Sequence, residues 1–215
     1  MILVAFDPSL SCTGWAVVKS MPREAGTASD AWQNGMLVAA GTITPEGETQ
    51  DYPARLSSLW SEARALLDEH EPGVVVVELP SKHVPTQGRG KQRTGQPIYG
   101  SAVGAVVGAA ACPFNARTGL RITPPRMLAF PPDVWTRSLP PGPRMTRDDP
   151  HKTRRVMYAA SLYGRRVEDF GGKTRGGDVA DAILIGRYGL YVYESETERA
   201  LFKERTYANG IRSKA

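Results

Sequence analysis

The stretch MILVAFD, residues 1–7, decides the predicted fold, because it is an unbroken apolar run that ends in an acid, Asp7. A second stretch of the same kind, VVVVE at residues 74–78, ends at Glu78. A short continuous apolar run bounded by turn residues indicates a strand that is covered on both faces. Each of the two carboxylates is therefore expected to project from the end of a buried strand.

Two further acids, Asp178 and Asp181, stand three residues apart at the start of another apolar stretch. If that stretch is a helix, the two side chains share one face. Carboxylates from two strand ends and one helix start can then converge, at a high cost unless a divalent cation neutralises them. A single acid more often caps a helix or faces solvent, so the prediction depends on the whole set. Because all the ligands are oxygens, Mg²⁺ or Mn²⁺ is expected rather than zinc.

Signals for strands and helices alternate along the chain, which indicates an α/β fold. The first three strands should form a meander, and Pro124 and Pro125 should push the last strand to a sheet edge. The predicted strands span residues 1–7, 14–19, 35–43, 74–78 and 120–130. The predicted helices span residues 53–67, 98–111, 131–135 and 151–163, and a last one begins at 178 and runs through 188. One domain over residues 1–193 and a peripheral tail over 194–215 are expected.

The composition fits a protein that binds a polyanion. The 215 residues include 27 Lys plus Arg against 22 Asp plus Glu, which gives a formal net charge of +5. No apolar run approaches the roughly 20 residues that span a bilayer, and the N-terminus lacks the features of a signal peptide. A cytoplasmic location is expected. The protein would be associated with the nucleoid or, if a phage encodes it, would lie in the cytoplasm of the host. The two cysteines, Cys12 and Cys112, are far apart and lack CxxC spacing, so they support neither a disulfide framework nor a zinc knuckle.

Basic residues gather in two predicted loops, 81–97 and 138–150, at the start of the helix at 151, and in the glycine-rich link 171–177. Such residues can contact the phosphate backbone of a nucleic acid. Each one alone is more often a solvated surface side chain. The candidate phosphate contacts are Arg89, Lys91, Arg93, Arg144, Arg147, Arg154, Arg155, Lys173 and Arg175.

Several motifs together resemble the RuvC-type Holliday junction resolvases, or crossover junction endodeoxyribonucleases, of the ribonuclease H-like superfamily. The segment FDPSLSCTGW at residues 6–15 is similar to the family's first acidic strand and turn, and residues 71–78 to its second acidic strand. Residues 132–134, followed by 151–152, resemble the segment in which a lysine of the family lies near the cleaved strand, and this lysine would be Lys152. DVADA at 178–182 resembles the family's final acidic motif. The order and spacing of these segments make the set specific.

The resemblance implies a ribonuclease H-like fold, with a mixed five-stranded sheet of an antiparallel meander plus parallel strands, flanked by helices. It also implies a homodimer that resolves four-way DNA junctions by paired nicks in recombination and repair. Asp7, Glu78, Asp178 and Asp181 would hold two Mg²⁺ or Mn²⁺ ions, and Lys152 would neutralise charge on the cleaved phosphate.

The chain departs from the family at Ser81, where an aromatic residue often stands three positions after the second acid. The basic segments 81–97 and 133–150 are also long, and a phage or mobile-element origin fits such divergence. A broader preference that includes flaps or replication forks therefore stays open.

Three other interpretations were weighed. The turn after Asp7 also resembles the phosphate loop of actin-like ATPases and sugar kinases, but those need two such domains and 215 residues are too few. A ribonuclease H-like nuclease acting on RNA or on RNA–DNA hybrids would use the same chemistry. A DNA-binding protein without catalytic activity would leave the four acids dispensable.

Overall fold

The computed structural model of the chain describes residues 1–21, 35–48, 50–79, 95–137, 151–166, 169 and 177–196. For residues 95–98 and 151–154 it describes the backbone alone. The two predicted basic loops and most of the link 171–177 lie largely outside these residues. The predicted tail boundary at residue 194 stays a prediction, because the last described helix ends at residue 196 and the chain beyond it is not described.

Five strands form one mixed sheet, as predicted. The strands are β1 (Ile2–Asp7), β2 (Thr13–Ser20), β3 (Gly35–Ile43), β4 (Val74–Glu78) and β5 (Arg126–Phe130), in the order β3-β2-β1-β4-β5. The first three are antiparallel neighbours, and β4 pairs in parallel with both β1 and β5. The meander and the edge position of the last strand are thus confirmed.

The two central strands, β1 and β4, are buried on both faces, as their unbroken apolar sequences predict. Leu3 and Val74 belong to the hydrophobic cluster on one face, whereas Val4 and Val75 belong to the cluster on the other. All of these side chains are completely inaccessible to solvent. This alternation follows from the two-residue period of a strand and requires a helical layer on each side.

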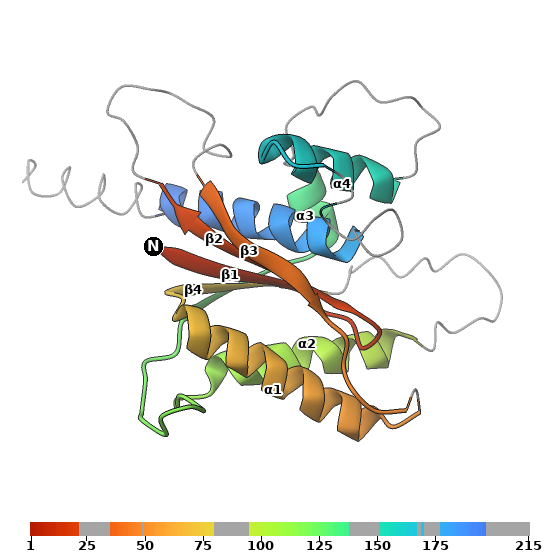
Figure 1. Ribbon diagram of the computed structural model, residues 1–215, viewed down its shortest axis with the longest axis vertical. Coiled ribbons are helices and arrows are strands. Elements are labelled where there is room, and N and C mark those ends of the chain that lie inside the picture. Colours follow the sequence, from red (N-terminus) through yellow and green to blue (C-terminus); the bar gives the residue numbers. More distant parts are fainter. Residues whose placement is uncertain are drawn as a thin grey trace, which may run out of the picture.

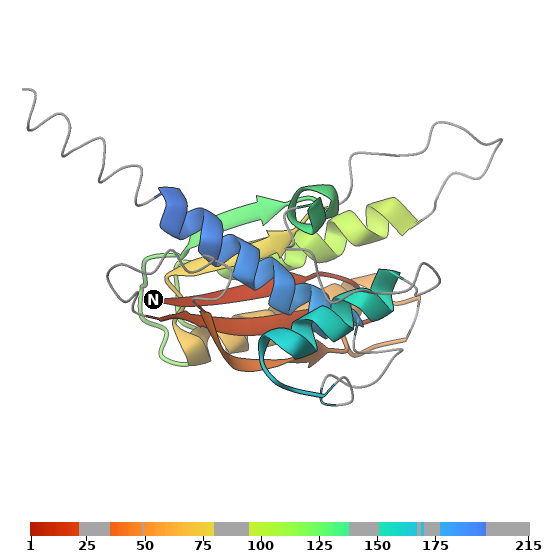
Figure 2. The same cartoon turned by 90° about the horizontal axis from the view of Figure 1, so that it is seen from above.

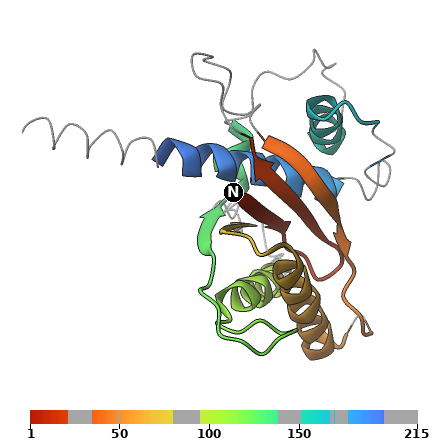
Figure 3. The ribbon, with the colours of Figure 1, turned by 60° about the vertical axis from the view of Figure 1, so that its left-hand side comes forward.

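Helices cover both faces of the sheet, so that the protein has three layers (Figure 1). On one face lie α1 (Tyr52–His70) and α2 (Gly95–Ala111). On the other lie α3 (Pro132–Arg137), α4 (His151–Leu162) and a helix over residues 177–196, which crosses the sheet beside α4 (Figure 2). Figure 3 shows α1 and α2 packed next to each other beneath the strands. None of the helices in the described part of the chain has both the length and the hydrophobicity needed to cross a membrane.

Two predicted boundaries were wrong. The last strand was expected over residues 120–130, but the strand begins only at Arg126. Pro124 and Pro125 have no N–H group for a sheet ladder, which ends the strand at that point. The basic loop expected over 81–97 ends earlier, because residues 95–97 already belong to α2.

Capping residues determine where helix α1 begins and ends. The side chain of Asp51 accepts a hydrogen bond from the backbone N–H of Ala54 at 3.0 Å, which caps the first turn, and Pro53 fits the first helical positions. At the other end Glu71 adopts a left-handed conformation with φ 44°, and its N–H donates to the carbonyl of Leu67 at 2.9 Å. This turn leads the chain directly into β4.

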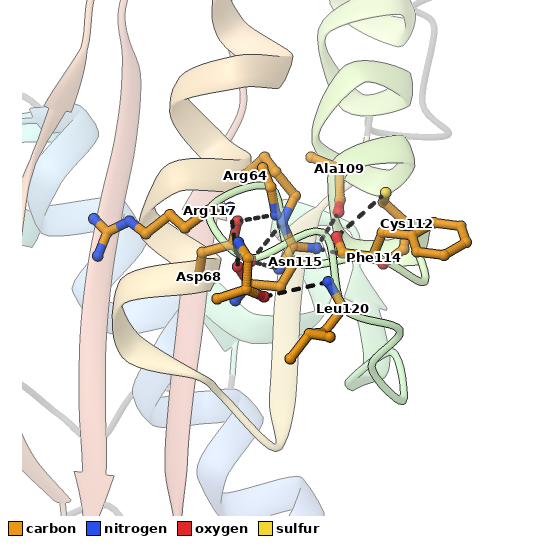
Figure 4. Close-up of polar contacts among 10 residues, drawn as sticks. Arg64, Asp68, Ala109, Cys112, Phe114, Asn115, Arg117 and Leu120 are labelled. Carbon is orange, nitrogen blue, oxygen red and sulfur yellow. Dashed lines mark hydrogen bonds and ion pairs between the residues drawn. The ribbon is translucent and has the colours of Figure 1, made fainter.

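A buried ion pair joins α1 to the end of α2 (Figure 4). The side chain of Arg64 pairs with that of Asp68, and its Nη1 donates to the carbonyl of Ala109 at 2.9 Å. The other carboxylate oxygen of Asp68 accepts from the N–H of Ala116 at 2.8 Å. A guanidinium at the carboxyl end of a helix satisfies carbonyls that have no partner within the helix. The pair therefore fixes α2 and the loop that follows it.

The turn between β1 and β2 brings the hairpin against the start of the 177–196 helix. Thr13 is completely buried and donates its hydroxyl to the carbonyl of Ser9 at 2.7 Å, which holds the turn. Gly14, the partner of Asp7 in the sheet, lies so close to the helix that a Cβ atom there would be 2.0 Å from the carbonyl oxygen of Asp178. Only glycine permits this approach.

We predict that Gly14→Ala destabilises the protein by about 1–3 kcal/mol or more, because the added methyl group overlaps a backbone carbonyl. Chemical denaturation followed by circular dichroism measures the change. Gly104→Ala is the matched control, since a Cβ there has no neighbour within 4 Å and alanine favours the helix by roughly 0.5–1 kcal/mol. Equal stability of the two variants would contradict the close approach at Gly14.

Candidate metal and nuclease site

Two of the four predicted acids lie at the ends of adjacent strands. Phe6 pairs with Val77 in the parallel ladder, so Asp7 and Glu78, one residue further along each strand, end neighbouring strands at the same edge. Both carboxylates are half-buried, because helices cover the sheet on each face. Each acid thus stands at the end of a buried strand, as the two apolar runs predict.

The other two acids reach the same edge from the 177–196 helix. Asp178 and Asp181 lie in its first turns, and the carbonyl of Asp178 touches Gly14, the sheet partner of Asp7. The side chain of Asp181 is only 7% exposed. The close approach of hairpin and helix thus carries these acids to the strand ends.

Asp7 interacts electrostatically with the other three acids. Burial raises the pKa of Asp7 well above its usual value, and the negative charges of Glu78, Asp181 and Asp178 raise that pKa further. The positive charge of Arg155 opposes this shift. Asp7 therefore lies within reach of all three other acids, at a place where a negative charge is costly.

Two aromatic side chains that the sequence motifs do not include hold Glu78 in place. Trp135 of α3 donates its Nε1–H to Glu78 Oε2 at 2.8 Å, and Tyr99 of α2 donates its hydroxyl to Glu78 Oε1 at 3.3 Å. Burial raises the pKa of Glu78, while these two hydrogen bonds and the charge of Arg155 lower it. The pKa of Tyr99 is raised by its own burial and by the charge of Glu78, so the phenol stays a donor. The only sequence signal was general: a buried Trp or Tyr needs a polar partner.

Arg155 of α4 faces the acids. Its Nε lies 2.9 Å from Asp181 Oδ1, and its guanidinium lies over the ring of Trp135, 5.8 Å from the centroid. The sequence prediction placed Arg155 among the residues that contact phosphates. Its side chain is 22% exposed, so in this structure it is mainly engaged inside the protein.

The remaining predicted residues cannot be placed in the same detail. Lys152 and Arg154 lie in the first turn of α4, where only the backbone is described, and α4 is the element that also carries Arg155. The other candidate phosphate contacts lie outside the described residues: Arg89, Lys91, Arg93, Arg144, Arg147, Lys173 and Arg175. Their roles stay predictions.

The donor chemistry of the four acids fits a hard divalent cation, because all ligands are oxygens and their mutual repulsion would fall when a cation binds. In the described part of the chain, however, no three His, Cys, Asp or Glu side chains are arranged as a ready metal site. The positive charge that now acts on Asp7 and Asp181 comes from Arg155.

No family model matches the chain, and no curated protein matches its sequence. Solved structures do match. RuvC of Thermus thermophilus is similar with a TM-score of 0.58 and 17% identity, over 91% of this chain and 97% of that one. The same protein in complex with a Holliday junction substrate matches with a TM-score of 0.57 and 17% identity, over 90% of this chain and 96% of that one. The yeast mitochondrial Holliday junction resolvase matches with a TM-score of 0.53 and 11% identity, over 94% of this chain and 85% of that one. The chain therefore has the ribonuclease H-like fold of these resolvases, and the predicted resemblance is confirmed for the fold.

We predict that Asp7→Asn stabilises the metal-free protein at neutral pH, because burial and three neighbouring carboxylates make the ionised form of Asp7 costly. The folded state raises the pKa of Asp7 above its usual value of 3.8, so it binds the proton more tightly than the unfolded chain does. Wild-type stability should therefore fall as the pH rises above about 4, through the window up to the raised pKa, and the variant should lack this loss.

Thermal unfolding in chelator between pH 4 and pH 8 measures the difference. The control is Glu69→Gln, because the side chain of Glu69 is 56% exposed and lies at the end of α1 that leads into the start of β4, whereas Glu78 lies at the other end of that strand. A gap between Asp7→Asn and wild type that stays constant across this pH range would contradict the raised pKa.

Proposed function

We propose that the protein is a divalent-metal-dependent endonuclease that resolves four-way DNA junctions by paired nicks, as part of DNA recombination or repair. The observation that carries the proposal is that Asp7 interacts electrostatically with Glu78, Asp178 and Asp181 at one end of the sheet. The fold supports it, because a structure with the same fold, RuvC of Thermus thermophilus, is described in complex with a Holliday junction substrate. The domain proposed for this activity covers residues 1–193, with 194–215 as a peripheral tail.

The four acids would hold two Mg²⁺ or Mn²⁺ ions, which supply a water nucleophile and stabilise the leaving oxygen of the phosphodiester. The protein's own contribution is to orient the acids. Trp135 and Tyr99 hold both oxygens of Glu78, so this carboxylate has a fixed direction before any ion arrives. Pre-orientation of this kind lowers the cost of assembling a site.

Basic residues would bind and position the DNA. Lys152, at the start of α4, would balance negative charge that develops on the cleaved phosphate, in the manner of an electrostatic stabiliser. The predicted phosphate contacts in the loops would add affinity that depends on salt but not on sequence.

Paired nicks require two active sites, so we infer a homodimer. Helix α2 is a candidate contact: a Cβ at Gly100 or Gly104 would have no neighbour within 4 Å, which leaves that face open to close approach. A Cβ at Gly108, by contrast, would lie 3.5 Å from Trp60 Nε1, so the helix packs against α1 at that position.

The decisive assay compares a synthetic four-way junction, a matched linear duplex, a flap and an RNA–DNA hybrid, in Mg²⁺, in Mn²⁺ and in chelator. We expect symmetric, metal-dependent nicks in the junction. We expect the rate to fall by at least about a hundredfold in Asp178→Asn, because one carboxylate ligand is replaced by a neutral amide. Glu69→Gln should cut like the wild type.

Each alternative has its own outcome in this assay. Equal cleavage of the flap would keep the metal chemistry and make the protein a general branch nuclease. Cleavage of an RNA–DNA hybrid in preference to the junction would favour a ribonuclease. Binding of the junction with no cleavage under any condition would favour a DNA-binding protein without catalytic activity.

A second prediction separates catalysis from binding among the basic residues. Lys152→Ala should lower the nicking rate by roughly a hundredfold and leave junction affinity within about twofold, because the lysine acts on the cleaved phosphate. Arg147→Ala, the comparison variant, should weaken binding and reduce the slope of log affinity against log salt by about one. The measurements are single-turnover cleavage and binding titrations at several salt concentrations. A Lys152→Ala variant that loses affinity but cuts bound junctions normally would refute the proposed role.

A further inference from the structure

Arg155 is placed among the acids and not at their periphery. Its Nε lies 2.9 Å from Asp181 Oδ1, and its charge also acts on Asp7 and Glu78, whose pKa values it lowers. Three of the four carboxylates therefore interact with this one cation. A single guanidinium from α4 thus compensates charges that come from two strands and another helix.

A second contact fixes the other side of the guanidinium. It lies over the ring of Trp135, 5.8 Å from the centroid, within the range of a cation–π contact. Trp135 is completely buried and donates to Glu78 Oε2 at 2.8 Å. Arg155 is thereby connected to Asp181 directly and to Glu78 through the indole.

The contact between Arg155 and Asp181 is an ion pair and is not aligned as a hydrogen bond. Its strength is mainly Coulombic, so it depends on charge more than on direction. A divalent cation carries twice the charge of a guanidinium, and Mg²⁺ binds carboxylate oxygens at roughly 2.0–2.1 Å. Such an ion is a direct competitor for the same oxygen.

We propose that Arg155 is the internal counter-ion of the acid cluster, and that it and a divalent cation exclude each other at Asp181. In the metal-free protein the guanidinium compensates the charge of the carboxylates. A divalent ion held by the acids would supply that compensation instead, and Arg155 would then be released from Asp181. The inference rests on the proposed metal-dependent function and assigns Arg155 a positioning role toward the metal.

The direction in which metal affinity changes when Arg155 is removed distinguishes this role from a merely structural one. If Arg155 only holds the cluster in shape, its removal should weaken metal binding. If Arg155 competes with the metal, removal of its charge should strengthen metal binding while it destabilises the metal-free protein, because the acids then repel one another without compensation.

The experiment is calorimetric titration of Mn²⁺ into the full-length protein without DNA, at fixed pH and ionic strength. We expect Arg155→Gln to bind Mn²⁺ roughly five- to tenfold more tightly than wild type, which corresponds to about 1–1.4 kcal/mol. Arg155→Lys, which keeps the charge, should stay within about twofold of wild type. The matched control is Arg117→Gln, because the side chain of Arg117 is 61% exposed and pairs with Glu69 at 3.9 Å, away from the acids. This control should leave the affinity unchanged.

Thermal unfolding provides a second readout that does not require a stable metal-free variant. Arg155→Gln should unfold at a lower temperature than wild type in chelator, and its Tm should rise more than that of wild type when Mn²⁺ is added. A variant that folds only when Mn²⁺ is present would meet the same expectation in its extreme form.

Unchanged or weaker Mn²⁺ binding by Arg155→Gln, with a normal wild-type titration that Asp178→Asn abolishes, would overturn the counter-ion role and leave the proposed nuclease chemistry in place. Absence of Mn²⁺ binding by both wild type and Arg155→Gln would overturn both together. Tighter binding by Arg155→Gln and by Arg117→Gln alike would also overturn the proposal, because a general change in net charge would then explain it.

Discussion

The parallel pairing of β1 with β4 places two carboxylates at adjacent strand ends, and the rest of the site depends on the repulsion that results. Asp7 and Glu78 cannot separate, because the ladder from Leu3 to Phe6 fixes the register of the two strands. Helices on both faces then reduce the access of water, so the cost of ionisation increases. The donors that surround Glu78 and the positive charge of Arg155 are local compensation for that cost.

The 177–196 helix adds to the repulsion and is nevertheless held in place by close packing. Gly14 permits contact with its first turn, and Gly189 further along lies so near β4 that a Cβ atom would be 2.4 Å from Val76 Cγ2. The helix buries a run of apolar residues against the sheet, which stabilises the fold through the hydrophobic effect. Packing energy along the whole helix therefore offsets the unfavourable placement of Asp178 and Asp181 at its start. Stability and site chemistry are supplied by different parts of one element.

The sequence predicted the parts of this arrangement that depend on local pattern. Both acidic strand ends follow from unbroken apolar runs, and β4 begins and ends at the predicted residues. Tyr99 and Trp135 were not selected, because their contacts with Glu78 depend on how α2 and α3 pack, which no local period encodes. Arg155 was selected for its charge, but whether a basic side chain on a helix faces DNA or the interior depends on the neighbouring elements. Tertiary contacts therefore decided the features that sequence reasoning missed.

Charge balance connects Arg155 to both states of the proposed enzyme. Burial raises the pKa of Asp7, and the three neighbouring carboxylates raise it further, because the one guanidinium of Arg155 offsets only part of their negative charge. Two divalent cations would neutralise the four carboxylates without help, so the positive charge of Arg155 would then have no acid to compensate. A phosphodiester brought to the same place carries one negative charge and accepts two hydrogen bonds from a guanidinium. The side chain that stabilises the metal-free cluster is thus suited, once the metal displaces it, to the phosphate contact that its sequence position first suggested.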